Sequence, residues 1–103
     1  MSGDGAGRAA AGAAVAADAR PAIPRGLKLQ WEAAQEAHVL LFPEGQVLLN
    51  GSAAEIMSRC DGMRTVAEIV ADIERTHSLS GIADDVGAFV ALALAKRWLE
   101  LRP

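Results

Sequence analysis

The chain has 103 residues and a formal net charge of −3, and its 10 basic residues are scattered rather than massed. This length allows one domain with a limited core, and the scattered charge argues against a nucleic-acid-binding surface. A single cysteine, Cys60, excludes an internal disulfide and fits a reducing cytoplasm. No apolar run approaches the roughly 20 residues that span a bilayer, and no secretory signal is recognisable. We therefore expect a cytoplasmic protein without a membrane segment.

The first 22 residues are mostly alanine and glycine, and after Met1 their bulkiest aliphatic side chain is Val15. The glycines interrupt a stretch that alanine alone would favour as helix. We expect a flexible tail or linker over residues 1–22, with a short transient helix over Ala9–Asp18 as the alternative. The folded domain is then predicted to span residues 23–103.

The first predicted element of the domain is a β-strand over residues 27–31. There, Leu27, Leu29 and Trp31 alternate with polar residues, which is the pattern of a half-buried strand. A short polar link over residues 33–36 then leads into the next strand.

A β-hairpin is predicted over residues 38–50. Two apolar runs flank a Pro-Glu-Gly sequence, in which the Pro43 ring presets the φ angle of a central turn position. Gly45 suits the positive φ angle that a three-residue hairpin loop requires. Because both faces of this hairpin are apolar, both need to be covered, which is a first hint of a binding function.

A three-residue loop also sets the expected register of the hairpin. It places Phe42 opposite Gln46, and side chains alternate between the two faces along each strand. One wholly apolar face should therefore meet the core, and it comprises Val39, Leu41, Val47 and Leu49. The strands over residues 27–31 and 46–49 are then the two edges of a three-stranded antiparallel sheet.

Three helices are predicted after the hairpin. The first starts at a capping-box pattern formed by Ser52 and Glu55 and ends before Gly62. The second starts at a second capping box, formed by Thr65 and Glu68, and carries an apolar stripe along one face.

The third helix is expected over residues 83–97, with acidic residues in its first turn and basic residues in its last turn. Its middle, Phe89–Ala95, has no polar face. Such a helix must be covered by more than its own small domain, or it must line a groove. The layout predicts an α+β, winged-helix-like fold, with a three-stranded antiparallel sheet followed by three helices.

Short motifs over residues 24–99 resemble one known family. They are Pro24-Arg25, Leu29-Gln30-Trp31-Glu32, Val39-Leu40-Leu41-Phe42-Pro43-Glu44-Gly45, Leu49-Asn50-Gly51-Ser52-Ala53, Cys60-Asp61-Gly62, Thr65-Val66-Ala67-Glu68-Ile69-Val70, Asp85-Val86 and Trp98-Leu99. In these motifs, the chain resembles the pyrroloquinoline quinone biosynthesis protein D (PqqD) family. It departs from that family at Arg97, which Trp98 follows directly where the family usually has glycine, and in its alanine-rich tail.

The resemblance implies a peptide chaperone of pyrroloquinoline quinone (PQQ) biosynthesis. Proteins of this family bind the ribosomally made precursor peptide PqqA and present it to the radical SAM enzyme PqqE, which cross-links a Glu and a Tyr of the peptide. The implied fold is the winged-helix-like precursor-peptide recognition element. The tail is similar to the tether of proteins in which this domain follows the oxidase PqqC, so a fused or associated PqqC domain is a further expected partner.

Strand addition is the binding mode that the resemblance implies and that the residues favour. The edge over residues 46–49 offers unpaired N–H and C=O groups to an extended peptide. The third helix would form the wall of the pocket. The expected peptide-binding residues are Gln46, Val47, Leu48, Leu49, Val86, Phe89, Val90, Ala93 and Leu94.

No catalytic or metal-binding site is predicted. His38 and His77 lack further ligands at metal-binding spacing, and Cys60 has no basic neighbour that would activate its thiol. No phosphate-binding loop or nucleophile motif is present. We expect a protein without enzymatic activity or cofactor. Asp84 and Asp85 are interpreted as a helix start, with contact to a partner as the alternative.

Two other functions are compatible with the layout. A winged-helix DNA-binding domain would need Arg, Lys, Asn or Gln on its recognition helix, whereas the third helix has Ala, Val and Leu. A passive dimerisation module would use the same strand edge and helix to meet a second copy. We expect a monomer or a weak homodimer, and no nucleic-acid or membrane partner.

Overall fold

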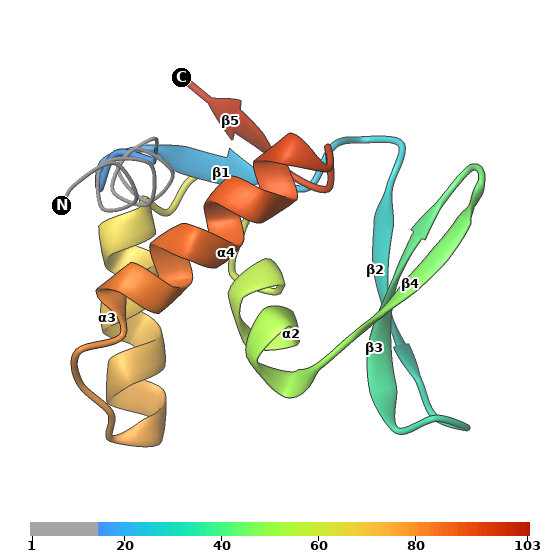
Figure 1. Cartoon of the computed structure of the whole chain (residues 1–103), viewed down its shortest axis with the longest axis horizontal. Helices are drawn as coiled ribbons and strands as arrows, with labels where there is room; N and C mark the ends of the chain where they lie inside the picture. Colours follow the sequence, from blue (N-terminus) through green and yellow to red (C-terminus); the bar gives the residue numbers. More distant parts are fainter. Residues whose placement is uncertain (1–14) are drawn as a thin grey trace, which may run out of the picture.

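The computed structural model describes residues 15–103 and confirms the predicted α+β, winged-helix-like fold (Figure 1). A three-stranded antiparallel sheet is followed by three helices, and two short strands join the ends of the described chain. In chain order, the elements are β1 (Arg20–Ala22), β2 (Lys28–Glu32), β3 (Ala37–Phe42), β4 (Gly45–Leu49), α2 (Gly51–Met57), α3 (Val66–His77), α4 (Ala83–Ala95) and β5 (Glu100–Arg102). The sheet order β2-β3-β4 confirms the two predicted edge strands.

The folded domain begins before residue 23. Arg20 of β1 pairs with Arg102 of β5, and the N–H of Val66 donates to the carbonyl of Ala19. Val15 is buried in the core. The prediction of a tail is therefore wrong for residues 15–22, because a strand of three residues that pairs with the far end of the chain has too few side chains to form a periodic pattern. The first 14 residues of the predicted tail lie outside the described residues.

The hairpin loop is one residue shorter than predicted. Only Pro43 and Glu44 join β3 to β4, and Phe42 pairs with Gly45 instead of Gln46. Gly45, with φ of +157°, is therefore the first residue of β4 and not part of the loop. Because side chains alternate along a strand, this shift of one residue changes which residues share a face.

The shifted register corrects the predicted core face of the hairpin. Leu40 and Leu49, not Val39 and Leu49, share the face that joins the main hydrophobic core. Val39 lies opposite Leu48 on the other face, and it is also fully buried. Both faces of β3 are thus covered at its centre.

The helix caps agree with the prediction at α3 but not at α2. The capping box of α3 is present, since the Thr65 hydroxyl accepts from the N–H of Glu68 at 3.1 Å and the Glu68 carboxylate accepts from the N–H of Thr65 at 2.8 Å. At α2, Asn50 replaces Ser52 as the cap, and its side chain accepts from the N–H of Ala53 at 2.8 Å. Asparagine caps as well as serine does, and Asn50 lies directly after β4, where the helix must start.

Helix α4 ends at Ala95, two residues earlier than predicted, in a Schellman motif. The N–H of Trp98 donates to the carbonyl of Ala93 at 2.8 Å, and the N–H of Arg97 donates to that of Leu94 at 3.1 Å. Arg97 has φ of 64°, the left-handed conformation for which glycine is the usual residue. The departure from the PqqD pattern at this position therefore leaves the helix end intact, with an arginine in a strained backbone conformation.

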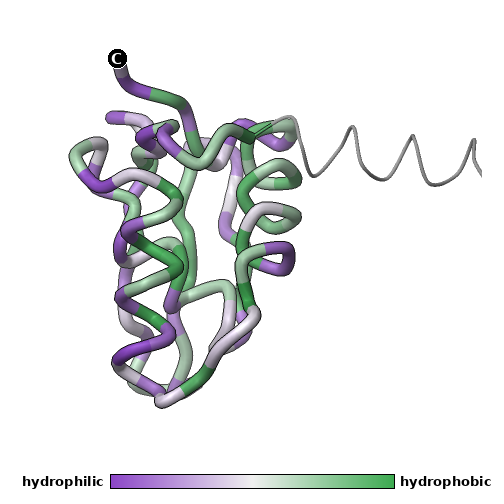
Figure 2. Tube along the Cα trace, turned by 90° about the vertical axis from the view of Figure 1, so that its left-hand side faces the viewer, coloured by the Kyte–Doolittle hydropathy of each residue, from purple (hydrophilic) through white to green (hydrophobic). Residues whose placement is uncertain are grey.

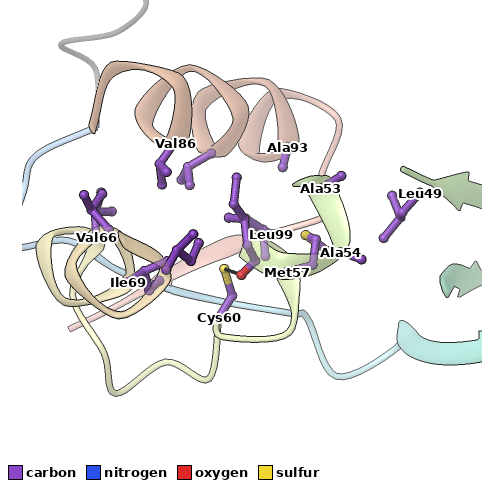
Figure 3. Close-up of a cluster of buried hydrophobic side chains, with 14 of the residues drawn as sticks. Leu49, Ala53, Ala54, Met57, Cys60, Val66, Ile69, Val86, Ala93 and Leu99 are labelled. Atoms are coloured by element: carbon purple, nitrogen blue, oxygen red, sulfur yellow. Dashed lines mark hydrogen bonds between the residues drawn. The ribbon is translucent and has the colours of Figure 1, made fainter. Parts of the chain in front are cut away.

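The core lies where the three helices and the inner face of the sheet meet (Figure 3). Its largest fully buried side chains include Leu40, Met57, Ile69 and Val90. Figure 2 shows that α3 has separate hydrophobic and hydrophilic sides, whereas α4 is hydrophobic over most of its length. Since only one side of α4 can meet this core, the other side must face outwards.

Candidate functional site

A groove of about 740 Å³ lies beside the end of β4. The start of α2, the C-terminal end of α3 and residues 85–92 of α4 form its walls, and most of its lining is apolar. Three large hydrophobic side chains that are exposed line this groove, namely Leu48 (56% exposed), Leu79 (51%) and Leu92 (48%). Exposed apolar surface concentrated in one concavity is typical of a binding site.

The groove lies next to an open sheet edge. β4 pairs with β3 on one side only, and none of the described strands pairs with its other side. Alternate residues of an edge strand direct their N–H and C=O groups away from the sheet. The edge therefore offers main-chain hydrogen bonds directly beside the apolar lining.

Four of the predicted site residues meet at this place. Leu48 and Leu49 come from β4, whereas Val86 and Phe89 come from the first half of α4, and all four line the groove. The other two predicted residues of β4, Gln46 and Val47, lie along the same strand but outside the lining of the groove.

Three predicted site residues of α4 lie elsewhere. Val90 and Ala93 are fully buried in the core, so a ligand cannot contact them. Leu94 lines a separate pocket of about 480 Å³, together with Pro24 and Leu99. The assignment of Val90 and Ala93 is wrong because an all-apolar helix gives no signal of which side packs against its own domain, whereas the assignment of Leu94 stays a prediction.

Sequence reasoning missed the part of the groove that follows α3. His77 ends α3, and Leu79 and Ile82 lie in the connection to α4. Two residues of this connection have a left-handed backbone conformation, since Ser78 has φ of 54° and Gly81 has φ of 75°. The only sequence signal for this part of the groove is a leucine, Leu79, among serines and a glycine. The connection is too short to show hydrophobic periodicity.

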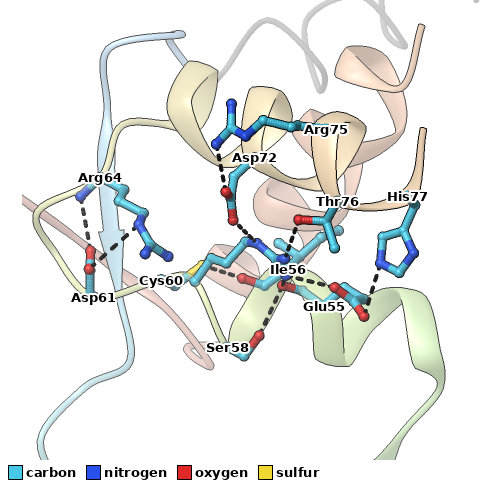
Figure 4. Close-up of polar contacts among 11 residues, drawn as sticks. Glu55, Ile56, Ser58, Cys60, Asp61, Arg64, Asp72, Arg75, Thr76 and His77 are labelled. Carbon is cyan, nitrogen blue, oxygen red and sulfur yellow. Dashed lines mark hydrogen bonds and ion pairs between the residues drawn. The ribbon is translucent and has the colours of Figure 1, made fainter. Parts of the chain in front are cut away.

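A polar network holds the α2 and α3 walls of the groove together (Figure 4). The Arg59 guanidinium donates to Glu55 Oε1 at 2.7 Å and to Asp72 Oδ2 at 2.6 Å. Glu55 Oε2 also lies 3.2 Å from His77 Nε2. The hydrogen bond from Arg59, followed by that from His77, lowers the pKa of Glu55 below its ordinary value of 4.5. The charge of Glu55 is thus already compensated within the protein.

The buried cysteine of the described chain is not activated as a nucleophile. Burial raises the pKa of the Cys60 thiol to about 12, and its Sγ donates to the carbonyl of Ile56 at 3.2 Å. Across residues 15–103, no three His, Cys, Asp or Glu side chains are grouped so that they could hold a metal ion. No helix in this range is long and apolar enough to cross a membrane.

Comparison with known proteins assigns the chain to a family. Residues 37–99, which are more than half of the chain, match the family model described as coenzyme PQQ synthesis protein D (PqqD). The chain belongs to the PqqD family. This match includes β3, β4, all three helices and therefore the whole lining of the groove.

Individual PqqD-family relatives are similar over most of their length. The chain is 48% identical over 83 residues to a PqqA binding protein of Stutzerimonas stutzeri, covering 80% of the chain and 90% of the relative. It is 49% identical over 82 residues to a PqqA binding protein of Azotobacter vinelandii, covering 79% and 89%.

A solved structure of the PqqD family has the same fold. It is the solution NMR structure of the PqqD truncation of Methylobacterium extorquens PqqCD, described as a functional, stand-alone recognition element for ribosomally synthesized and post-translationally modified peptides. It is 30% identical to the chain with a TM-score of 0.72, and the match covers 86% of the chain and 97% of that structure. The family predicted from the sequence motifs is therefore confirmed.

Proposed function

We propose that this PqqD-family chain binds the precursor peptide PqqA as an added strand on β4 and presents it to the radical SAM enzyme PqqE. The names of its relatives and the recognition-element structure support peptide binding. The observation that carries the proposal is the open edge of β4 beside a groove lined by Leu48, Phe89 and Leu92.

Strand addition uses both features of this site. An extended peptide satisfies the free N–H and C=O groups of the edge, which gives affinity that is independent of sequence. Because side chains alternate along a strand, every second peptide residue points into the groove. We therefore expect recognition of a peptide segment with apolar residues at alternate positions.

The site offers binding contacts, and we expect a separate enzyme to carry out the reaction on the peptide in the cytoplasm. Binding the peptide as an extended strand leaves its remaining residues free to enter another protein. The similar M. extorquens domain comes from a PqqCD protein. A fused or associated PqqC domain is therefore an expected partner here as well.

Two matched leucines allow a direct test of the groove. Leu92 is 48% exposed and lines the groove, whereas Leu101 is 47% exposed and lies on β5, outside it. Burying a leucine contributes about 1.5–3 kcal/mol, so Leu92→Glu is expected to weaken PqqA binding by about tenfold or more in calorimetric titration. Leu101→Glu should bind like the wild type. Equal affinity of all three proteins would exclude the groove as the binding site.

Presentation to the enzyme needs a second measurement. PqqE is incubated with PqqA and either the wild-type chain or Leu92→Glu, and the cross-linked peptide is quantified by mass spectrometry. We expect product formation to fall with the variant at peptide concentrations below its weakened Kd. Product formation that is independent of the chain would contradict the presentation step while leaving peptide binding untouched.

A further inference from the structure

The groove is lined by three ionisable side chains, and they differ in their partners. Glu55 on the α2 wall and His77 on the α3 wall bind each other at 3.2 Å. Glu55 also binds Arg59 at 2.7 Å. The third group, Asp85, lies on the α4 wall and forms no ion pair or side-chain hydrogen bond with any of residues 15–103. The groove therefore contains one exposed carboxylate without a side-chain partner among the described residues.

The helix dipole alone does not account for the position of Asp85. Asp84 and Asp85 are both in the first turn of α4, where a carboxylate interacts favourably with the helix N-terminus. Only Asp85 lines the groove. The two residues thus share the same stabilising role, and they differ in whether a bound ligand reaches them.

A peptide in the groove changes the surroundings of Asp85. Apolar peptide side chains that fill the lining displace water, and a carboxylate that loses water without gaining a partner opposes binding. Arg59, which binds the groove residue Glu55, also donates to Asp72 and forms no ion pair with Asp85. Asp85 is exposed in the free protein, so a basic side chain of the ligand would replace the water that a bound peptide displaces from it.

From this we infer that Asp85 selects a lysine or arginine side chain of the bound peptide, an inference that rests on the proposed function. The aliphatic stem of such a side chain can lie along the apolar lining, next to Ile82 and Phe89, while its charged head reaches the carboxylate. Specificity then has two parts, with alternate apolar residues filling the groove and one basic residue meeting Asp85.

One feature of α4 favours an acidic rather than a basic group of the peptide, and this makes the inference testable. The N-cap residue, Ile82, provides no side-chain hydrogen bond, so the first N–H groups of α4 lack a side-chain cap. Uncapped N–H groups attract anions. If the peptide placed an acidic group there, removing the charge of Asp85 would strengthen binding.

The experiment compares Asp85→Asn with Asp84→Asn in the full chain, using synthetic PqqA and calorimetric titration at low and high salt. We expect Asp85→Asn to weaken binding about threefold to fivefold at low salt, as for a partly exposed ion pair, with a smaller difference at high salt. Asp84→Asn, which removes the same charge from the same helix turn, should bind like the wild type.

A second arm identifies the partner of Asp85 in the peptide. Each lysine and arginine of PqqA is replaced in turn by norleucine. One of these peptides should bind the wild type more weakly by the same factor and bind Asp85→Asn with no further loss, as a double-mutant cycle requires for a direct pair. The peptide series on the wild-type protein does not depend on how well a variant folds, and only the closing step of the cycle uses Asp85→Asn.

Three results would overturn the inference, namely equal or tighter PqqA binding by Asp85→Asn, an equal loss in Asp84→Asn, or coupling of Asp85 to none of the basic residues. These results leave the proposed function standing, provided that the wild type binds PqqA. A wild type that does not bind PqqA would overturn the proposed function, and this inference with it.

Discussion

Arg59 Nε and Asp72 Oδ2 lie 2.6 Å apart and join the turn after α2 to α3 by a charge-assisted hydrogen bond. The Arg59 side chain is 13% exposed, and it also holds Glu55, which lines the groove. Asp72 forms a second ion pair, at 2.8 Å, with Arg75, which is 73% exposed. The same carboxylate thus binds one arginine between two helices and another on the surface.

Removing Arg59 should therefore matter more than removing Arg75. We expect Arg59→Met to lower the free energy of unfolding by about 1–2 kcal/mol, because Glu55 and Asp72 both lose their part-buried donor and keep only His77 and Arg75. Arg75→Met should have little effect, as is usual for an exposed ion pair. Urea denaturation of the two variants checks this, and equal losses would contradict a special role for Arg59.

Stability should fall in acid because of Glu55. Hydrogen bonds from Arg59 and His77 lower the pKa of Glu55 in the folded state below its ordinary value of 4.5. As the pH falls below 4.5, the unfolded chain takes up the proton first, so the unfolded state is favoured until the folded state is protonated too. The urea midpoint of Glu55→Gln, measured from pH 6 to pH 3, should therefore fall less steeply than that of the wild type. An unchanged slope would show that Glu55 does not contribute.

The end of α4 offers a stabilising substitution. Arg97 has φ of 64°, which costs a non-glycine residue about 1 kcal/mol or more. Arg97→Gly should raise the melting temperature by relieving this strain. The neighbouring Lys96 has φ of −87°, so Lys96→Gly should lower the melting temperature through its cost in backbone entropy and through loss of the contact between Lys96 Nζ and the Trp98 ring, 5.7 Å from its centroid. A lower melting temperature for both variants would contradict the strain at Arg97.

The Cys60 thiol should be unreactive in the folded protein. Burial raises its pKa to about 12, and the thiolate is the form that attacks a disulfide reagent. We expect no reaction with Ellman's reagent at pH 8 in buffer, and stoichiometric reaction in denaturing urea. Rapid labelling of the folded protein would mean that the side chain is accessible.

Local sequence signals predicted those parts of the fold that neighbouring residues decide. The capping box of Thr65 and Glu68 marked the start of α3 because both partners are three residues apart. Alternation marked β2, and the strand order made it an edge. The motifs over residues 24–99 indicated the PqqD family, and the matches over most of the chain confirm it.

The hairpin register and the domain boundary needed contacts between distant residues. A Pro-Glu-Gly sequence is compatible with either loop length, and the pairing of Phe42 with Gly45 follows from which face of the hairpin packs best on the core. The pairing of Arg20 with Arg102 joins the two ends of the described chain, so no local pattern announces it.

The sequence by itself determined that α4 carries more apolar surface than a small domain can bury, and that β4 is an edge. Only the tertiary structure decided that Val90 faces the core while Leu92 lines the groove. It also decided that Asp85 lines the groove and Asp84 does not. The physical reason is that a helix which is apolar all round has no sequence signal for its orientation, so the packing of α2 and α3 against it sets which side chains stay exposed.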